Sequence, residues 1–132
     1  MTRIVDTSVV VKWFVAEEGQ EAAEALIGQP LIAPDLILAE VSNAAWKKWR
    51  GKEIGEDQAV LAQTLVSSFI ELVPSRPLAG QALAIAIELA HPVYDCFFLA
   101  LAELREMSLV TADKRLIGRC GGSRFEKLIE AL

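Results

Sequence analysis

Short apolar runs alternate along this chain with longer amphipathic stretches. The runs at residues 2–5, 31–33, 69–73 and 108–111 are rich in apolar or β-branched side chains and are bounded by polar residues or proline, as buried strands are. The longer stretches repeat apolar residues at helical spacing and end near glycine or proline. They predict helices over residues 9–14, 17–27, 35–50, 56–68, 77–90, 95–107 and 114–119. The tail, residues 124–132, fits either a strand or a helix.

Strands that alternate with helices predict a parallel sheet with helices on both faces. The expected fold is therefore a single α/β domain of Rossmann-like appearance. A length of 132 residues leaves room for one domain, so we expect it to cover residues 1–132. Ligands of such sheets bind outside the carboxyl ends of the strands, so a polar side chain that directly follows a strand is a candidate for function.

Composition agrees with a folded domain. Hydrophobic residues make up 53% of the chain and charged residues 23%, which supports a large core and excludes disordered and fibrous classes. No apolar stretch reaches the roughly 18 residues of a membrane span, and Lys12 interrupts the run at residues 9–15. Asp6 comes too early for the apolar core of a signal peptide. We therefore expect a cytoplasmic protein without a membrane segment.

Charge and cysteine content narrow the function classes. Lysine and arginine total 13 against 18 acidic residues, a formal charge of −5, which argues against a uniformly basic surface for nucleic acid. An acidic balance favours cations as ligands, although it is also common for solubility alone. Cys96 and Cys120 form no CxxC pair, and His91 is the only histidine, so neither a disulfide framework nor a zinc site is expected.

Four acidic residues lie within apolar sequence rather than among polar neighbours. Each has a structural interpretation by itself, because the three aspartates suit helix N-caps and the glutamate suits a paired buried acid. Two of them follow predicted strands and a third begins a helix at the same level of the sheet, so the acids can converge. They are Asp6, Glu40, Asp95 and Asp113.

Converging carboxylates need a positive partner. Two of them about 5 Å apart repel by roughly 3 kcal/mol at an effective dielectric of about 20. A bound metal ion removes this repulsion, and without histidine or cysteine ligands an all-oxygen site selects Mg²⁺ or Mn²⁺. Such a site suits phosphodiester hydrolysis.

Four short motifs in this order resemble those of PIN-domain proteins, and in particular the VapC-type toxins of toxin–antitoxin pairs. The resemblance covers nearly the whole chain. It implies a Mg²⁺- or Mn²⁺-dependent ribonuclease, usually a homodimer, that is inhibited by a small VapB-like antitoxin. The motifs are Asp6-Thr7-Ser8 after the first strand, Glu40 within residues 38–44, Tyr94-Asp95 at the start of an apolar helix, and Thr111 to Leu116.

The resemblance also implies roles for individual residues. Asp6, Glu40 and Asp95 match the core metal-binding acids of the family, and Asp113 matches a fourth, more variable acid. The hydroxyl position beside the first acid falls on Thr7 or Ser8. Thr111 matches the position two residues before the last acid.

Basic residues follow Glu40 along the same predicted helix. At 3.6 residues per turn, Asn43, Lys47 and Arg50 share its face and can lead RNA phosphates toward the metal. The alternative is a solvated helix end favoured by the helix dipole. Lys12 is a further candidate RNA contact. The aromatic residues Trp13, Phe14, Trp46 and Trp49 belong either to the core or an interface, which we favour, or to a base-stacking surface.

Two other functions remain open. One is a PIN-like protein that binds metal or nucleic acid without turnover, and the other is a DNA-cleaving nuclease of the same fold. The four intact acids favour hydrolysis over binding alone. A phosphoacceptor receiver domain and a dehalogenase-type phosphatase are disfavoured because Asp6 is followed by Thr7 and Ser8 rather than by a second acid. No glycine-rich turn follows the first strand, which disfavours a dinucleotide site.

Overall fold

Five parallel strands form the centre of the molecule, in the order β3-β2-β1-β4-β5. The structure is a computed structural model that describes all 132 residues. The strands are β1 (Arg3–Val5), β2 (Leu31–Pro34), β3 (Glu71–Val73), β4 (Leu109–Thr111) and β5 (Ile129–Ala131). The α-helices are α1 (Thr7–Val10), α2 (Gln20–Glu24), α3 (Ile37–Arg50), α4 (Glu56–Phe69), α5 (Ala79–Leu89), α6 (Val93–Arg105) and α7 (Lys114–Cys120). Short 3₁₀ turns occupy Val11–Trp13, Arg76–Leu78 and Glu126–Leu128.

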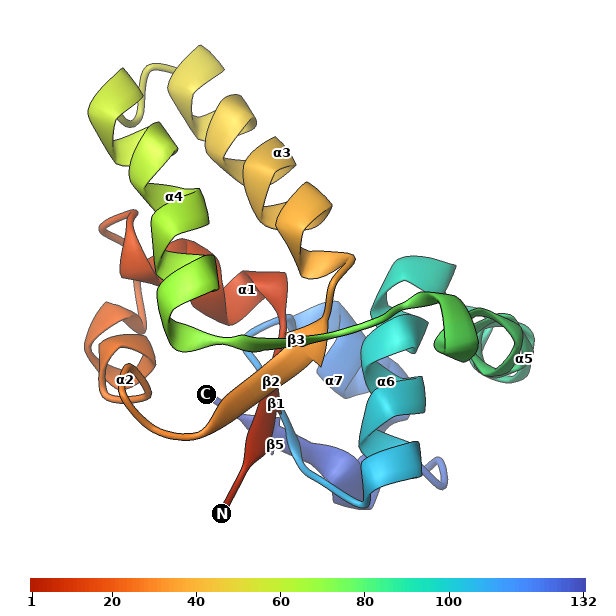
Figure 1. Cartoon of the computed structure of the whole chain (residues 1–132). Coiled ribbons are helices and arrows are strands. Elements are labelled where there is room, and N and C mark those ends of the chain that lie inside the picture. The colour runs from red at the N-terminus through yellow and green to blue at the C-terminus, as the bar shows by residue number, and fades with distance from the viewer.

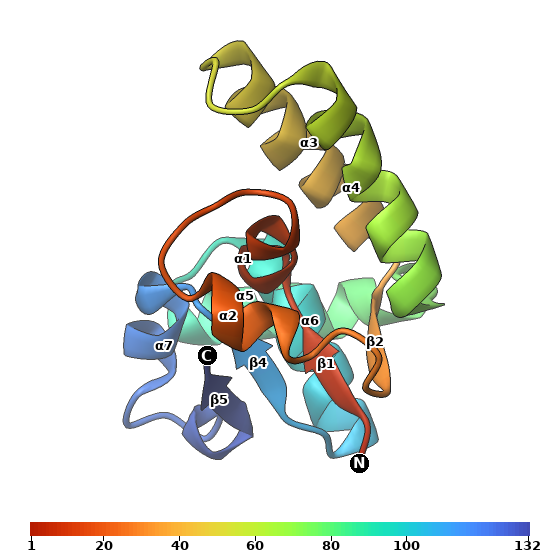
Figure 2. The ribbon, with the colours of Figure 1, turned by 90° about the vertical axis from the view of Figure 1, so that its left-hand side faces the viewer.

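Helices cover the sheet on both sides. Helix α6 packs across β1, β2 and β4, and α5 packs against α6. Helix α2 lies on the opposite face, as Figure 2 shows. The strands β2 and β4, which flank the central strand β1, are buried along their whole length, as expected for a sheet covered on both faces. The predicted α/β class, a parallel sheet with helices on both faces, is confirmed.

Helices α3 and α4 pair as an arm that projects beyond the carboxyl edge of the sheet (Figure 1). Their contact is apolar, with Val41 and Ala45 on α3 and Ala62 and Val66 on α4 buried. Helix α1 and the 3₁₀ turn after it pack against the base of the arm. The arm therefore stands beside the ends of the strands, where a site is expected.

Several predicted boundaries moved because tertiary contacts outweigh local pattern. The predicted helix at residues 17–27 is regular only over Gln20–Glu24, since Gly19 precedes it in the left-handed region at φ +85°. Helix α4 continues through Phe69, whose ring packs edge-on against Trp13 at 6.4 Å between centroids, so β3 begins only at Glu71. The predicted strand at residues 69–73 is thus shorter by two residues.

The C-terminal segment, which fitted either a strand or a helix, is a short 3₁₀ turn followed by a strand. Ile129 pairs with Leu109 and Ala131 with Thr111, so β5 completes the sheet beside β4. Helix α6 starts at Val93, slightly earlier than expected, and ends at Arg105. Pairing with a neighbouring strand, which periodicity does not report, decides the state of the tail.

Helices α5 and α6 are the most apolar pair in the chain. No single helix of this protein is long and apolar enough to cross a membrane, whereas α5 with its preceding turn and α6 pass that test together, bent by 112°. Six consecutive α6 residues from Cys96 to Leu101 include five that are buried. The apolar character of α6 thus reflects its contacts with the sheet and with α5.

Candidate active site

Topology brings the four predicted acids to one edge of the sheet. Asp6 directly follows β1, and Asp113 follows the neighbouring strand β4 after Ala112. Glu40 lies in the first turn of α3, which begins shortly after β2 ends. The last turn of α6 lies near the beginning of β4, because the chain passes directly from this helix into that strand. The first turn of α6, which holds Asp95, therefore lies near the carboxyl edge of the sheet. All four acids therefore occur at the carboxyl edge.

Asp6 is the most deeply buried of these acids, with 4% of its surface exposed. It is the N-cap of α1, and its Oδ1 accepts hydrogen bonds from the amide of Ser8 at 3.0 Å and from the Ser8 hydroxyl. Burial raises the pKa of Asp6 to about 6, although the hydrogen bonds from Ser8 and Thr111 lower it; the negative charge of Asp95 raises it further. The N-cap interpretation of Asp6 is confirmed. Capping uses only Oδ1, so Oδ2 is left to contact another side chain.

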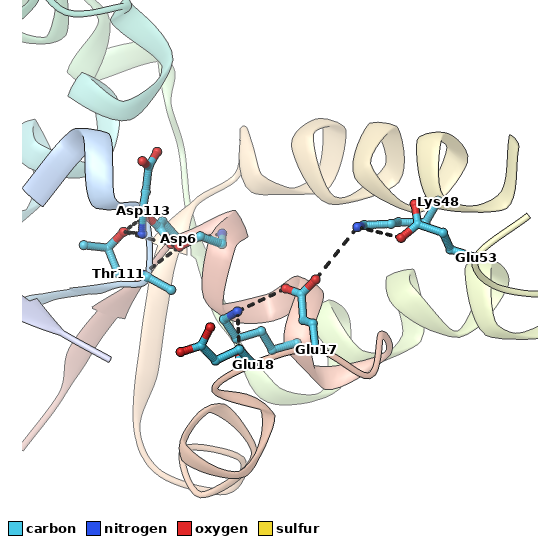
Figure 3. Close-up of polar contacts among 10 residues, drawn as sticks. Asp6, Glu17, Glu18, Lys48, Glu53, Thr111 and Asp113 are labelled. Atoms are coloured by element: carbon cyan, nitrogen blue, oxygen red, sulfur yellow. Dashed lines mark hydrogen bonds and ion pairs between the residues drawn. The ribbon is translucent and has the colours of Figure 1, made fainter. Parts of the chain in front are cut away.

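That partner is the buried hydroxyl of Thr111, at the end of β4, which donates to Oδ2 of Asp6 at 2.5 Å. The same hydroxyl oxygen accepts from the amide of Asp113 at 3.1 Å, and the Ser8 hydroxyl accepts from the amide of Ala112 at 2.9 Å. Figure 3 shows Asp6, Thr111 and Asp113 side by side where the two strands end. These bonds fix the Asp6 carboxylate to both strands.

Glu40 approaches Asp6 from the arm. Its Oε1 accepts a hydrogen bond from the hydroxyl of Thr7 at 3.0 Å. Partial burial raises the pKa of Glu40 to about 7; the bond from Thr7 lowers it, and the nearby charges of Asp95 and Asp6 raise it. Of the two candidates for the hydroxyl position, Thr7 contacts Glu40 and Ser8 contacts Asp6.

Asp95 contacts the only histidine of the chain, and the sequence interpretation missed this. Oδ2 of Asp95 lies 2.6 Å from Nε2 of His91, which is 6% exposed. The predicted N-cap role of Asp95 is wrong, because Pro92 holds the N-cap position of α6. Residues four apart can pair on one face of a helix, so the spacing of His91 and Asp95 was a signal for this contact. The signal was overlooked because Pro92 places His91 in the turn before the helix. The turn forms because Ala90 adopts a left-handed conformation at φ +51°.

Asp113 is oriented differently from the other three. It caps α7, and its Oδ1 accepts from the amides of Arg115 at 2.9 Å and Leu116 at 3.3 Å. Its predicted capping role is confirmed. One carboxylate oxygen of Asp113 is thus committed to its own helix, which leaves the other for solvent or a ligand.

The side chains of the acid cluster are chemically compatible with a hard divalent cation. Asp6, Glu40 and Asp113 take part in no ion pair with lysine or arginine. Glu40 is held near Asp6 by the hydroxyl of Thr7, the residue that follows Asp6. No three histidine, cysteine, aspartate or glutamate side chains form a ready-made ligand cage. Mg²⁺ needs no such cage, because it keeps several waters and takes one or two carboxylates. The oxygen donors present match that preference.

A basic groove adjoins the acids between α1 and the arm. It is a cavity of about 350 Å³ whose walls include Ser8, Lys12, Lys47 and Lys48. Glu17 also lines it, and pairs with Nζ of Lys12 at 3.1 Å and with Nζ of Lys48 at 3.8 Å. Figure 3 shows Glu17 reaching toward Lys48. The groove joins the acid cluster to the face of α3 that carries its lysines.

The other predicted residues lie elsewhere on α3 or inside the core. Asn43 and Arg50 are exposed on α3, outside the walls of the groove, and the guanidinium of Arg50 lies 5.3 Å from the ring centroid of Trp46. Trp13 and Phe14 are buried, which confirms their core placement. Trp46 and Trp49 are each 48% exposed and line an apolar groove between α3 and α4.

The two acids with raised pKa values predict an unusual pH dependence of stability. In the metal-free protein, carboxylates that ionise near pH 6 and 7 when folded, but near 4 when unfolded, favour the folded state at low pH. We expect their contribution to the free energy of unfolding to be lost as pH rises from about 4 to 7. Urea denaturation in EDTA across this range measures the effect. Glu40→Gln should lessen the decline, whereas an exposed control, Glu126→Gln, should not; equal slopes in the two variants would contradict the assignment.

Comparison with known proteins agrees with this arrangement. The PIN domain family matches residues 3–121. A curated relative, ribonuclease VapC3 of Pyrobaculum aerophilum, is 32% identical over 121 residues, which cover 88% of this chain and 92% of the relative.

Solved structures show the same fold. A protein of Pyrobaculum aerophilum superposes with a TM-score of 0.71 at 25% identity, covering 93% of this chain and 82% of that one. A toxin–antitoxin complex from Klebsiella pneumoniae gives 0.67 at 16% identity, covering 97% and 95%. The order of motifs, the position of the acids and the extent of these matches agree: the chain belongs to the PIN-domain family, and within it to the VapC group.

Proposed function

We propose that this chain is a divalent-metal-dependent endoribonuclease and the toxin of a toxin–antitoxin pair. The observation that carries the proposal is the buried Asp6, held by two strands beside Glu40 and Asp95, without a basic side chain to balance it. Membership of the VapC group, with a relative named a ribonuclease, supports RNA as the substrate. The place of action is then the cytoplasm, where RNA is found.

Each residue has a distinct task in the proposed reaction. A divalent cation, Mg²⁺ or Mn²⁺, supplies positive charge that neutralises the carboxylates and stabilises charge on the phosphodiester. Asp6, Glu40 and Asp95 would hold it, with Asp113 contributing through the oxygen that does not cap α7. Thr111 and Ser8 orient Asp6, and Thr7 orients Glu40. Preorganisation of this kind keeps the carboxylates in place before the substrate binds.

The basic groove is the proposed entrance for RNA. Lys12 and Lys47 line it beside Ser8, so phosphates bound there lie next to the acids. Asn43 and Arg50, on the same helix but outside the walls of the groove, are also proposed to contact RNA. Phosphate contacts of this kind position a strand without reading its sequence.

A cleavage assay tests the proposal directly. Purified protein is incubated with structured RNA and Mg²⁺ or Mn²⁺, and the products are separated on denaturing gels. We expect internal cleavage of RNA. Cleavage of matched single-stranded DNA alone would favour the DNA nuclease instead, and metal binding in calorimetry with no product from either would favour a binding protein without turnover.

Glu17 should weaken RNA binding in the wild-type chain, because it occupies Lys12 and Lys48 inside the groove. We expect Glu17→Gln to increase affinity for single-stranded RNA several-fold and to steepen the salt dependence, since Lys12 loses its only ion-pair partner and can contact a phosphate. Lys48 gains less, because it keeps its ion pair with Glu53 at 3.2 Å. Fluorescence anisotropy at two salt concentrations measures both. Glu126→Gln makes the same change of net charge on an exposed residue, and an equal gain there would mean that net charge alone acts.

Two protein partners complete the proposal. The solved toxin–antitoxin complex with this fold supports a VapB-like antitoxin, and the family resemblance supports a homodimer. Large apolar side chains are exposed on the arm, at Trp46, Trp49 and Val60, and on α5, at Leu83 and Ile87. Exposed apolar patches of this kind mark contacts with other proteins. Sedimentation of the purified chain measures whether it is a dimer.

A further inference from the structure

A second basic cavity lies beside the acids, on α7. It encloses about 390 Å³ and is lined by His91, Lys114, Arg115, Gly118 and Arg119, with no apolar residue among them. None of its lysine or arginine side chains takes part in an ion pair. Three positive charges thus surround one hollow without a carboxylate partner.

The stability of α7 does not explain this placement. Lys114 and Arg115 are the first two residues of the helix, where the helix dipole disfavours positive charge. Arg115 and Arg119 are four residues apart, so they repel across one turn. Only Arg119, in the last turn, is placed favourably for the dipole. A ligand with negative charge would remove both unfavourable interactions.

The cavity is joined to the acid cluster through side chains already described. Its wall residue His91 contacts Asp95 at 2.6 Å, and Lys114 directly follows Asp113. The first basic groove meets the same cluster at Ser8 and Ala112. The acids therefore have a basic cavity next to them at two places, one reached past α1 and the other past α7.

We propose that the cavity on α7 binds a phosphate of the RNA strand next to the phosphate that is cleaved. Lys114, Arg115 and Arg119 would contact it, and guanidinium groups suit this role because they donate two parallel hydrogen bonds to phosphate oxygens. His91 connects this phosphate site to Asp95 and acts as a positioning residue. The inference rests on the proposed ribonuclease function and extends it, since it gives the strand two anchoring points beside the acids.

A matched pair of double variants tests the phosphate site. Arg115→Gln with Arg119→Gln removes two charges from the cavity. Arg105→Gln with Lys127→Gln removes two exposed charges that take part in no ion pair, one at the end of α6 and one just before β5. Both pairs are compared in binding of labelled single-stranded RNA, with Asp6→Asn added to prevent cleavage.

We expect the cavity variant to bind RNA about tenfold or more weakly, and the slope of log affinity against log salt to shrink by about 1.4, or roughly 0.7 for each lost contact. The control pair should leave both unchanged. With Asp6 intact, the cavity variant should raise KM for RNA cleavage more than it lowers kcat. Thermal melting confirms that each variant is folded.

The results separate this inference from the proposed function. If the wild-type chain cleaves RNA and the two double variants behave alike, the phosphate site is wrong and the ribonuclease remains. If the chain neither binds nor cleaves RNA, both proposals fail. If the cavity variant loses affinity only for a matched DNA strand, the cavity does not serve RNA and the inference is overturned.

Discussion

Replacing Asp6 with asparagine is expected to lower the rate of RNA cleavage on the order of 10³-fold, because the change removes the buried charge that we propose holds the cation. The side chain keeps its size and an oxygen that can accept from the amide of Ser8. The new NH₂ group faces the hydroxyl of Thr111, which can rotate to accept a hydrogen bond. The fold should therefore survive. Rates are measured from the appearance of RNA fragments under saturating Mg²⁺ and Mn²⁺.

Two controls make the Asp6 result specific. Asp57→Asn makes the same chemical change on an exposed residue of α4 and should cleave like the wild type. Metal-free Asp6→Asn should also melt no lower than the metal-free wild type at pH 8, because burial disfavours the ionised carboxylate whose pKa is about 6. Wild-type cleavage by Asp6→Asn would exclude this residue from the reaction.

Removal of divalent metal is the second large effect. EDTA should lower cleavage by a similar factor, on the order of 10³-fold, and added Mg²⁺ or Mn²⁺ should restore it. A cation that binds only the folded protein adds about 2.7 kcal/mol at one hundred times its dissociation constant, which raises the melting temperature by roughly 5 to 10 °C. Thermal melting with and without the ion measures this second readout independently of substrate.

The metal requirement should change with pH in a defined direction. The pKa of Asp6 is raised to about 6 and that of Glu40 to about 7, so protons compete with the cation for both carboxylates below these values. As pH falls, the Mg²⁺ concentration that gives half of the maximal rise in melting temperature should increase. The increase should be up to about tenfold per pH unit for each proton that the cation displaces. A carboxylate metal site would be contradicted if melting curves at pH 5.5 and pH 8 showed the same Mg²⁺ requirement. Cleavage that persists in EDTA would contradict it as well.

The sequence identified most of the candidate site because its acids lie in apolar surroundings. The apolar runs alone indicate that Asp6 and Asp113 follow strands. Thr111, a supporting residue predicted from the sequence, donates a hydrogen bond to Asp6. Roles for Asp6, Glu40, Asp95 and Asp113 in metal binding stay predictions. The apolar surroundings of the acids and the family resemblance thus located the residues, while their hydrogen-bond partners required the fold.

What the sequence did not show depends on contacts between distant or irregular segments. The bond between His91 and Asp95 requires the left-handed turn at Ala90, which no apolar pattern reports. Glu17 meets Lys48 across 31 positions of sequence, so its place in the basic groove was equally hidden. The tail became a strand only because β4 offered an unpaired edge. Each of these follows from tertiary neighbours rather than from local preference.

The base of the α3–α4 arm lies against the edge of the sheet, and this placement has a dynamic consequence. Asp6 is fixed to β1 and β4, whereas Glu40 belongs to the arm and meets the rest of the site through Thr7. A cation held by both residues would link the arm to the sheet. Without it, the arm contacts the rest of the molecule mainly through α1 and the 3₁₀ turn that follows α1. Bound metal would then slow local opening of the arm, and amide hydrogen exchange in α3 would become the most sensitive record of whether the site is filled.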